Sequence, residues 1–312
     1  MKSDSRKVIY AALGANSLIA VSKFVAASIT GSSAMLSEGV HSVVDTGNQG
    51  LLLLGMRRAK KPADAAHPFG YGAEIFFWAF VVAILIFAVG AGISFYEGVY
   101  KLLNPHPIEK AYINYIVLGL AFVFEAFAWV IAYKEFRKAQ GNRRKFRLFT
   151  AVRQSKDPAT FTVLFEDSAA MLGLVVAAAG VAGADALGLQ WADGVASIVI
   201  GAILAGAAIL LARETKGLLI GEAADPAVVR GIREIIREAP DILHINELRT
   251  MHLSPDEILL ALSVDFADGI SSQKVEEAVS TLERMIKESY PEVRRVFIEV
   301  QATHDGMARR ST

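Results

Sequence analysis

Three ionisable side chains, Glu38, His41 and Asp45, follow one another at spacings of three and four residues inside an apolar stretch. On an α-helix these spacings place them on one stripe, and Asn48 extends that stripe by a further turn. An imidazole and a carboxylate four residues apart can bind one ion together, and such nitrogen and oxygen donors suit the tetrahedral shell of zinc. We therefore predict that His41 and Asp45 bind a metal ion, with Glu38 and Asn48 lining the ion pathway or taking part in proton transfer.

A second apolar stretch contains the adjacent acids Glu166 and Asp167. Two ligands from one helix cannot complete four-coordination, so a second helix has to contribute. Neighbouring helical residues point about 100° apart, and we expect only one of the two acids to face the ion directly. Small residues follow at Ala169, Ala170 and Gly173, which would let the two helices approach closely.

Two structural explanations compete with an ion pathway. Polar residues inside a membrane bundle can act as hydrogen-bonding contacts between helices, and Glu97, Glu125 and Asp193, near the ends of apolar stretches, can be interfacial. Lys23 can be a counter-charge for a buried acid or a lysine that reaches toward the membrane surface. A charge at the bilayer centre costs about 2.5 to 3.5 kcal/mol, which favours function for the acids and His41 taken together.

Composition excludes several classes of protein. The chain has 312 residues, 53% of them hydrophobic, and a mean hydropathy of +0.39, which is too apolar for an ordinary soluble protein. The net charge is zero, so a nucleic-acid partner has no support, and the absence of cysteine excludes thiolate chemistry. A membrane metalloprotease would need an H-E-x-x-H helix, which the sequence lacks, so we do not expect an enzyme.

The apolar stretches predict an all-α transmembrane bundle of six helices in the lipid bilayer, because a span takes about 20 apolar residues. The stretches are Val8–Ile29, Ala34–Met56, Ile75–Tyr100, Ala111–Tyr133, Phe161–Ala182 and Trp191–Ala212. Basic residues gather before the first stretch and after the second and fourth, which places both termini in the cytosol. No leader rich in arginine and serine is present, so we expect a bacterial inner membrane.

Beyond Arg213 the pattern becomes that of a soluble domain, so we expect a transport domain at 1–213 and a cytosolic domain at 214–312. Asp225 and Pro226 predict the start of a helix that runs to Ala239. A second helix and three strands are expected further on, and the order αββαβ favours an α+β, ferredoxin-like domain. The strands are Ile242–Leu253, Ile258–Phe266 and Val293–Val300, and the helix is Ser271–Glu288.

The residues from Ser32 to Gly72 resemble the cation diffusion facilitator family, chiefly through Ser37–Asp45 and the loop motifs Pro62–Asp64 and His67–Gly72. The resemblance covers nearly the whole chain and is greatest to the branch of animal mitochondrial zinc transporters and their bacterial relatives. It implies a homodimer that exports Zn²⁺ as its transported substrate, by alternating access, while protons move the opposite way.

The resemblance also assigns residues. It implies that His41, Asp45 and Asp167 bind the metal, while the usual fourth ligand falls on Val163, so Glu166 or water is expected to replace it.

The loop residues Asp64 and His67 match positions where some relatives bind a second metal, but another expected histidine is replaced by Tyr71. A structural role for this pair is the alternative.

In the cytosolic domain, Asn246, Ser263 and Glu299 stand where relatives often have metal-binding histidines, so we expect dimerisation by packing without metal. The metal itself is less constrained: histidine favours zinc over magnesium or calcium, while Mn, Fe, Co and Cd stay open. Another function that stays open is a membrane metal sensor without flux.

Overall fold

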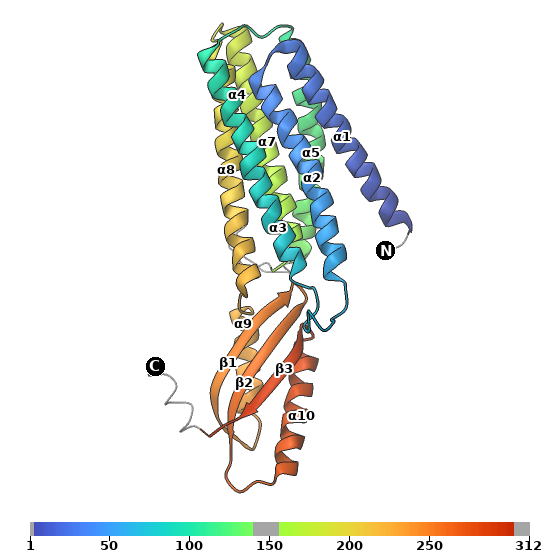
Figure 1. Cartoon of the computed structure of the whole chain (residues 1–312), viewed down its shortest axis with the longest axis vertical. Helices are drawn as coiled ribbons and strands as arrows, with labels where there is room; N and C mark the ends of the chain where they lie inside the picture. The colour runs from blue at the N-terminus through green and yellow to red at the C-terminus, as the bar shows by residue number, and fades with distance from the viewer. Residues whose placement is uncertain (1–2, 140–155, 303–312) are drawn as a thin grey trace. The chain divides into compact units, whose positions relative to one another are not determined.

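The computed structural model describes residues 3–139 and 156–302 (Figure 1). Their contacts form two compact units. The first comprises Met1–Arg58 and Glu74–Lys216, and the second comprises Ala59–Ala73 and Gly217–Thr312, each as far as it is described. The basic residues predicted after the fourth apolar stretch lie mostly between 140 and 155, outside the described residues.

The first unit is a bundle of long helices, and each predicted apolar stretch corresponds to one of its helical segments. The third segment consists of α3, the π-helical turn η1 and α4 in direct succession. In Figure 1 the helices run lengthwise beside one another. Their bounds are α1 Ser3–Thr30, α2 Ser33–Ala59, α3 Glu74–Leu85, η1 Ile86–Ala91, α4 Gly92–Leu103, α5 Ala111–Ala139, α7 Pro158–Ala186 and α8 Trp191–Ile220.

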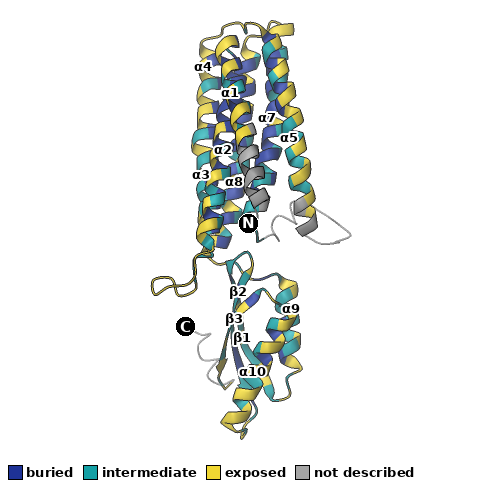
Figure 2. Ribbon diagram, turned by 90° about the vertical axis from the view of Figure 1, so that its right-hand side faces the viewer, coloured by how far each residue is buried: buried dark blue, intermediate teal, exposed yellow. Residues whose placement is uncertain are grey.

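Within the part of the chain that the structure describes, four helical segments are long and apolar enough on their own to cross a membrane, namely Glu74–Leu103, Ala111–Lys134, Phe161–Ala186 and Trp191–Ile220. Helix α2 has 27 residues, enough for a span, but its ionisable residues lower its hydropathy. Among the described side chains of α1, the apolar run is Asn16–Thr30. Figure 2 shows buried residues between the helices and exposed ones on their outer sides, so polar groups of α2 are kept from lipid by neighbouring helices.

Asp193, in the first turn of α8, fixes one end of α2. Its carboxylate accepts hydrogen bonds from the backbone N–H groups of Ser33 (2.7 Å) and Ala34 (3.3 Å). These donors have no partner within the helix, so the carboxylate acts as a cap. Lys101 Nζ lies 3.8 Å from Asp193 and donates to the backbone oxygen of Gly31 at 2.8 Å. This contact holds the α1–α2 connection against α4 and α8, which sets where the stripe on α2 lies.

The second unit has the predicted order αββαβ, with α9 Pro226–Arg237, β1 Ile242–Ser254, β2 Glu257–Phe266, α10 Ser272–Ser289 and β3 Val293–Val300. Strand β2 lies in the centre, antiparallel to β1 and parallel to β3. Asp225 accepts from the N–H of Ala227 at 2.7 Å and Pro226 occupies the first turn of α9, which confirms the predicted helix start.

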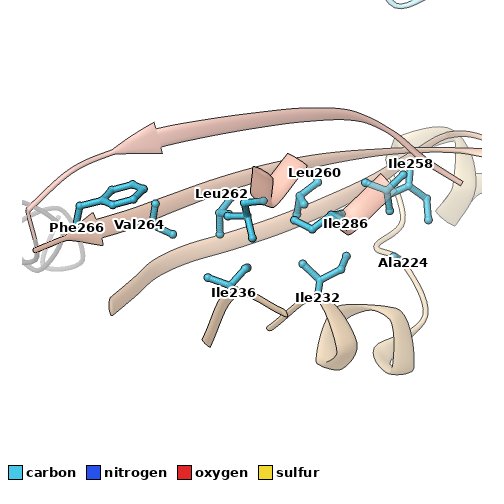
Figure 3. Packing of buried hydrophobic residues seen from close by; sticks show 11 residues of the cluster. Ala224, Ile232, Ile236, Ile258, Leu260, Leu262, Val264, Phe266 and Ile286 are labelled. Carbon is cyan, nitrogen blue, oxygen red and sulfur yellow. The ribbon is translucent and has the colours of Figure 1, made fainter. Parts of the chain in front are cut away.

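The core of this second unit lies between the sheet and the two helices. Figure 3 shows Ile232 and Ile236 of α9 facing Leu260 and Leu262 of β2. All four side chains are 2% exposed or less, as expected for a helix that buries one apolar stripe against a sheet.

The loop Ala59–Ala73 groups with the second unit. Its Phe69 ring meets the ring of Phe297 edge-on at 6.4 Å, and the Arg295 guanidinium lies 5.4 Å from the centre of the Phe69 ring. Edge-to-face and cation–π contacts of this kind each contribute about 0.5 to 1.5 kcal/mol. The loop that follows α2 is therefore held by strand β3.

Candidate metal site

The predicted stripe on α2 is buried along its whole length. Glu38, His41, Asp45 and Asn48 are 0%, 2%, 5% and 1% exposed, respectively. Helix α7 contributes Glu166 and Asp167, which are 3% and 5% exposed. Every ionisable residue of the predicted pathway is thus enclosed by the bundle.

Several donor atoms on α2 and α7 have no hydrogen-bond partner in the protein. Both ring nitrogens of His41 are unpartnered, as are Oδ1 of Asp45 and Oδ2 of Asp167. A buried polar group without a partner costs about 1 to 3 kcal/mol, and a charged one costs more. These nitrogen and oxygen atoms are shielded from water and have no partner in the protein. We expect their partner to be a transported cation or a proton.

The carboxylates of Asp45, Glu125 and Asp167 converge from three helices, with one oxygen of each within 4.8 Å of the others. His41 lies one helical turn from Asp45 but does not belong to this group. Glu125 is 8% exposed and lies in the middle of α5, so the expectation that it is an interfacial residue near a span end was wrong. The signal that could have identified it is the cost of placing a carboxylate inside a span.

Helices α5 and α7 are joined close to this group. Trp129 Nε1 donates to Ser168 Oγ at 2.8 Å, and Ser168 Oγ donates to the backbone oxygen of Leu164 at 2.7 Å. Trp129 follows Glu125 by one turn and Ser168 follows Asp167 directly. The indole bond therefore helps to hold α5 in the rotation in which Glu125 lies near Asp167.

Glu166 contacts Asn48, whereas its neighbour Asp167 lies near Asp45 and Glu125. Glu166 Oε1 accepts a hydrogen bond from Asn48 Nδ2 at 2.7 Å, which joins α7 to α2. The two adjacent acids thus diverge, as the helical rotation between neighbours predicts. Asn48 and Glu166 lie beside the carboxylate group and link the two helices that carry His41, Asp45 and Asp167.

Lys23 is a counter-charge and does not reach toward the membrane surface. Its ammonium donates to Glu38 Oε2 at 2.9 Å and to Ser42 Oγ at 2.8 Å, with both charged side chains fully buried. A Cβ on Gly173 of α7 would collide with Glu38 Oε1, so glycine makes room for this carboxylate. The Lys23–Glu38 pair places a balanced charge next to the metal-binding candidates.

Two family models match the chain. The cation efflux transmembrane domain matches residues 9–220, and the cation efflux protein cytoplasmic domain matches residues 224–302. The chain belongs to the cation efflux family. Among curated relatives, it is 32% identical over 260 residues to "Proton-coupled zinc antiporter SLC30A9, mitochondrial" of Homo sapiens, covering 83% of this chain and 46% of that protein.

A second relative is "Metal tolerance protein C4" of Arabidopsis thaliana, 28% identical over 262 residues, covering 84% of this chain and 57% of that protein. The chain thus spans about half the length of the curated relatives it matches. Membership confirms the resemblance drawn from Ser37–Asp45 and the loop motifs. The chain is an integral membrane protein of the cation efflux family.

Asp64 and His67, the predicted second metal-binding pair, lie in the loop after α2. The Asp64 carboxylate accepts three hydrogen bonds from that loop. Asp64 Oδ1 accepts from the N–H groups of His67 (2.7 Å) and Ala66 (3.0 Å), and Oδ2 accepts from the Tyr71 hydroxyl at 2.7 Å. The Tyr71 bond first, and then the His67 N–H, hold the pKa of the Asp64 carboxyl below its usual value. His67 Nδ1 lies 3.5 Å from Asp64, and both side chains are about half exposed. These contacts order a turn.

In the second unit Asn246 has a structural role, since its Nδ2 donates to the backbone oxygen of Gln301 at 2.7 Å. Ser263 is 7% exposed on β2, and Glu299 is exposed on β3. Within residues 3–139 and 156–302, the group of Asp45, Glu125 and Asp167 is the one place where three potential ligands converge.

Proposed function

We propose that this cation efflux protein is a zinc/proton antiporter that exports Zn²⁺ from the cytosol by alternating access. The observation that carries the proposal is the set of buried, unpartnered donor atoms on His41, Asp45 and Asp167. They lie on α2 and α7, two helices that a conformational change can move relative to each other. The human relative is named a proton-coupled zinc antiporter, which supports the same exchange.

Zinc is the proposed cargo because an imidazole accompanies the carboxylates. Nitrogen donors suit zinc better than magnesium or calcium, and the neutral imidazole removes no positive charge from the ion. Glu166 or water is the proposed further ligand, with Asn48 holding Glu166 until the ion enters. Manganese, iron, cobalt and cadmium are the competing substrates that a flux assay has to include.

Exchange with protons follows from the identity of the ligands. His41, Asp45 and Asp167 bind a metal ion only when they have released their protons, so loading with metal and loading with protons are alternatives. If the site opens to one side of the membrane at a time, a proton gradient directed inward drives the metal outward. No phosphate-binding loop of the G-x-x-x-x-G-K-[ST] type occurs in the sequence, so the gradient is the proposed energy source.

We further propose a homodimer with both termini in the cytosol, in the inner membrane of a bacterium. The cytoplasmic family domain at residues 224–302 supports an association through the second unit. Exposed apolar side chains on its strands support the same idea, since Leu243, Phe297 and Val300 are 67%, 55% and 50% exposed. The outward direction of transport depends on this orientation.

The test is transport by the full chain in sealed vesicles that contain a zinc indicator and a pH dye. We expect an imposed proton gradient to drive zinc against it with an opposite pH change, and Asp45→Asn or His41→Ala to abolish that flux while dimer formation persists. Glu97→Gln is the matched control, since Glu97 lies in a span without belonging to the carboxylate group. Glu166→Gln reduces the flux if Glu166 binds the ion.

Two results would count against the proposal. Normal zinc flux through Asp45→Asn would show that the ion uses another path, and zinc movement without an opposing pH change would show a uniporter. Metal binding without any flux in the unmodified protein would favour the alternative of a membrane metal sensor.

A further inference from the structure

We infer that Glu125 of α5 is a ligand of the transported cation, which makes this an oxygen-rich site contributed by three helices. The inference rests on the proposed function and extends it to a helix that neither the α2 stripe nor the α7 acids include. Its basis is the convergence of the Glu125, Asp45 and Asp167 oxygens within 4.8 Å. Two oxygens bound to one ion lie at most about 4 to 5 Å apart, twice the metal–oxygen distance. The three carboxylates are thus close enough for one cation.

An independent observation supports a binding role for this group of carboxylates. Asp45 and Asp167 are both 5% exposed, and each has a buried oxygen with no protein partner. No cationic side chain forms an ion pair with these acids among the described residues, since the nearby Lys23 pairs with Glu38. Three ionised carboxylates gathered in a buried space repel one another, so they require a bound cation or protons to neutralise them.

The position of Glu125 is built into the bundle. The bond from Trp129 to Ser168 fixes α5 against α7 one turn beyond Glu125 and one residue beyond Asp167. Together with the packing of α5 against α7, this bond keeps Glu125 on the side of α5 that faces Asp167.

Glu125 has a consequence for metal choice. With His41 outside the group of three carboxylates, the donors that converge here are all oxygens. Oxygen donors suit manganese, whereas an imidazole suits zinc. Removing one oxygen should therefore weaken Mn²⁺ binding more than Zn²⁺ binding, because zinc retains His41 as an alternative nitrogen donor.

The experiment measures binding of Zn²⁺, Mn²⁺ and Co²⁺ to the full-length protein in detergent, by calorimetry, for Glu125→Gln, Asp45→Asn and the control Glu97→Gln. Loss of a group that supports a metal site costs about 10- to 100-fold in affinity. We expect at least that loss for Mn²⁺ in Glu125→Gln, a smaller loss for Zn²⁺, and unchanged affinities in Glu97→Gln. The visible absorption of bound Co²⁺ should also change in Glu125→Gln, because it reports the ligands directly.

The outcomes separate the two proposals. If Glu125→Gln binds and transports all three metals normally while Asp45→Asn does not, the role of Glu125 is overturned and the proposed function stays intact. Normal binding and flux in Asp45→Asn would refute the site of the proposed function itself. If Glu125→Gln does not fold, Glu125→Asp keeps the charge but withdraws the oxygens by one methylene. An unchanged Co²⁺ spectrum and Mn²⁺ affinity in that variant would also overturn the inference.

Discussion

Replacement of Lys23 by methionine should destabilise the bundle strongly. The substitution leaves Glu38 fully buried and without its 2.9 Å partner, and also removes the bond to Ser42. An exposed ion pair would contribute at most about 1 kcal/mol, but both members of this pair are 0% exposed. The relevant figure is that for breaking a buried pair, about 3 to 5 kcal/mol. Reversible unfolding of the full chain in mixed detergent micelles measures this loss.

The matched control is the double variant Lys23→Met with Glu38→Gln. Because it removes both charges, it should recover most of the stability that Lys23→Met loses, which gives a coupling free energy of about 3 kcal/mol between the two positions. The same cycle tests the geometry of the pair. Additive losses in the two single variants, with no recovery in the double variant, would refute the reasoning that Glu38 depends on Lys23.

Two further predictions concern close packing and the loop. Gly173→Ala should lower the melting temperature, since its Cβ meets the Glu38 carboxylate and overpacking costs about 1 to 3 kcal/mol, whereas Gly119→Ala, with nothing within 4 Å, should not. Equal melting temperatures for the two variants would contradict this contact. Tyr71→Phe should raise the pKa of Asp64 toward its usual value, because the largest cause of its lowering is lost. Carbon NMR of labelled aspartate across a pH titration checks this shift. As the pH falls, any stability that the ionised carboxylate contributes would be lost at a higher pH in Tyr71→Phe than in the unmodified protein.

Much of the fold follows from periodicity and length alone. The apolar stretches predict the majority of the ends of the long helices to within a few residues. Helix α7 begins at Pro158, where the Asp157 side chain accepts a hydrogen bond from the N–H of Ala159 at 3.1 Å. Strand β3 has the predicted bounds Val293–Val300. These elements are set by local patterns, namely a hydrophobic run, a cap and a proline, which a single sequence displays directly.

The site was less accessible to the same reasoning. Spacing places His41 and Asp45 on one face, but it does not show which acid from another helix meets them. The part played by Glu125 depends on the rotation of α5, which a bond between Trp129 and Ser168, 39 residues apart in the chain, helps to hold. The partner of Lys23 likewise depends on tertiary structure. The sequence is equally compatible with a counter-charge for a buried acid and with a lysine that reaches toward the membrane surface.

The π-helical turn η1 gives the third span a break in phase. Over Ile86–Ala91 the backbone fits one residue more than an α-helix would hold, so α4 is rotated relative to a straight continuation of α3. One residue corresponds to about 100° of rotation. A helical wheel drawn through the whole span would therefore assign the wrong face to Lys101, the residue that reaches Gly31 and Asp193 from α4. In this span α3 and α4 share one direction but differ in helical phase, so the residues that face neighbouring helices have to be assigned separately for each of them.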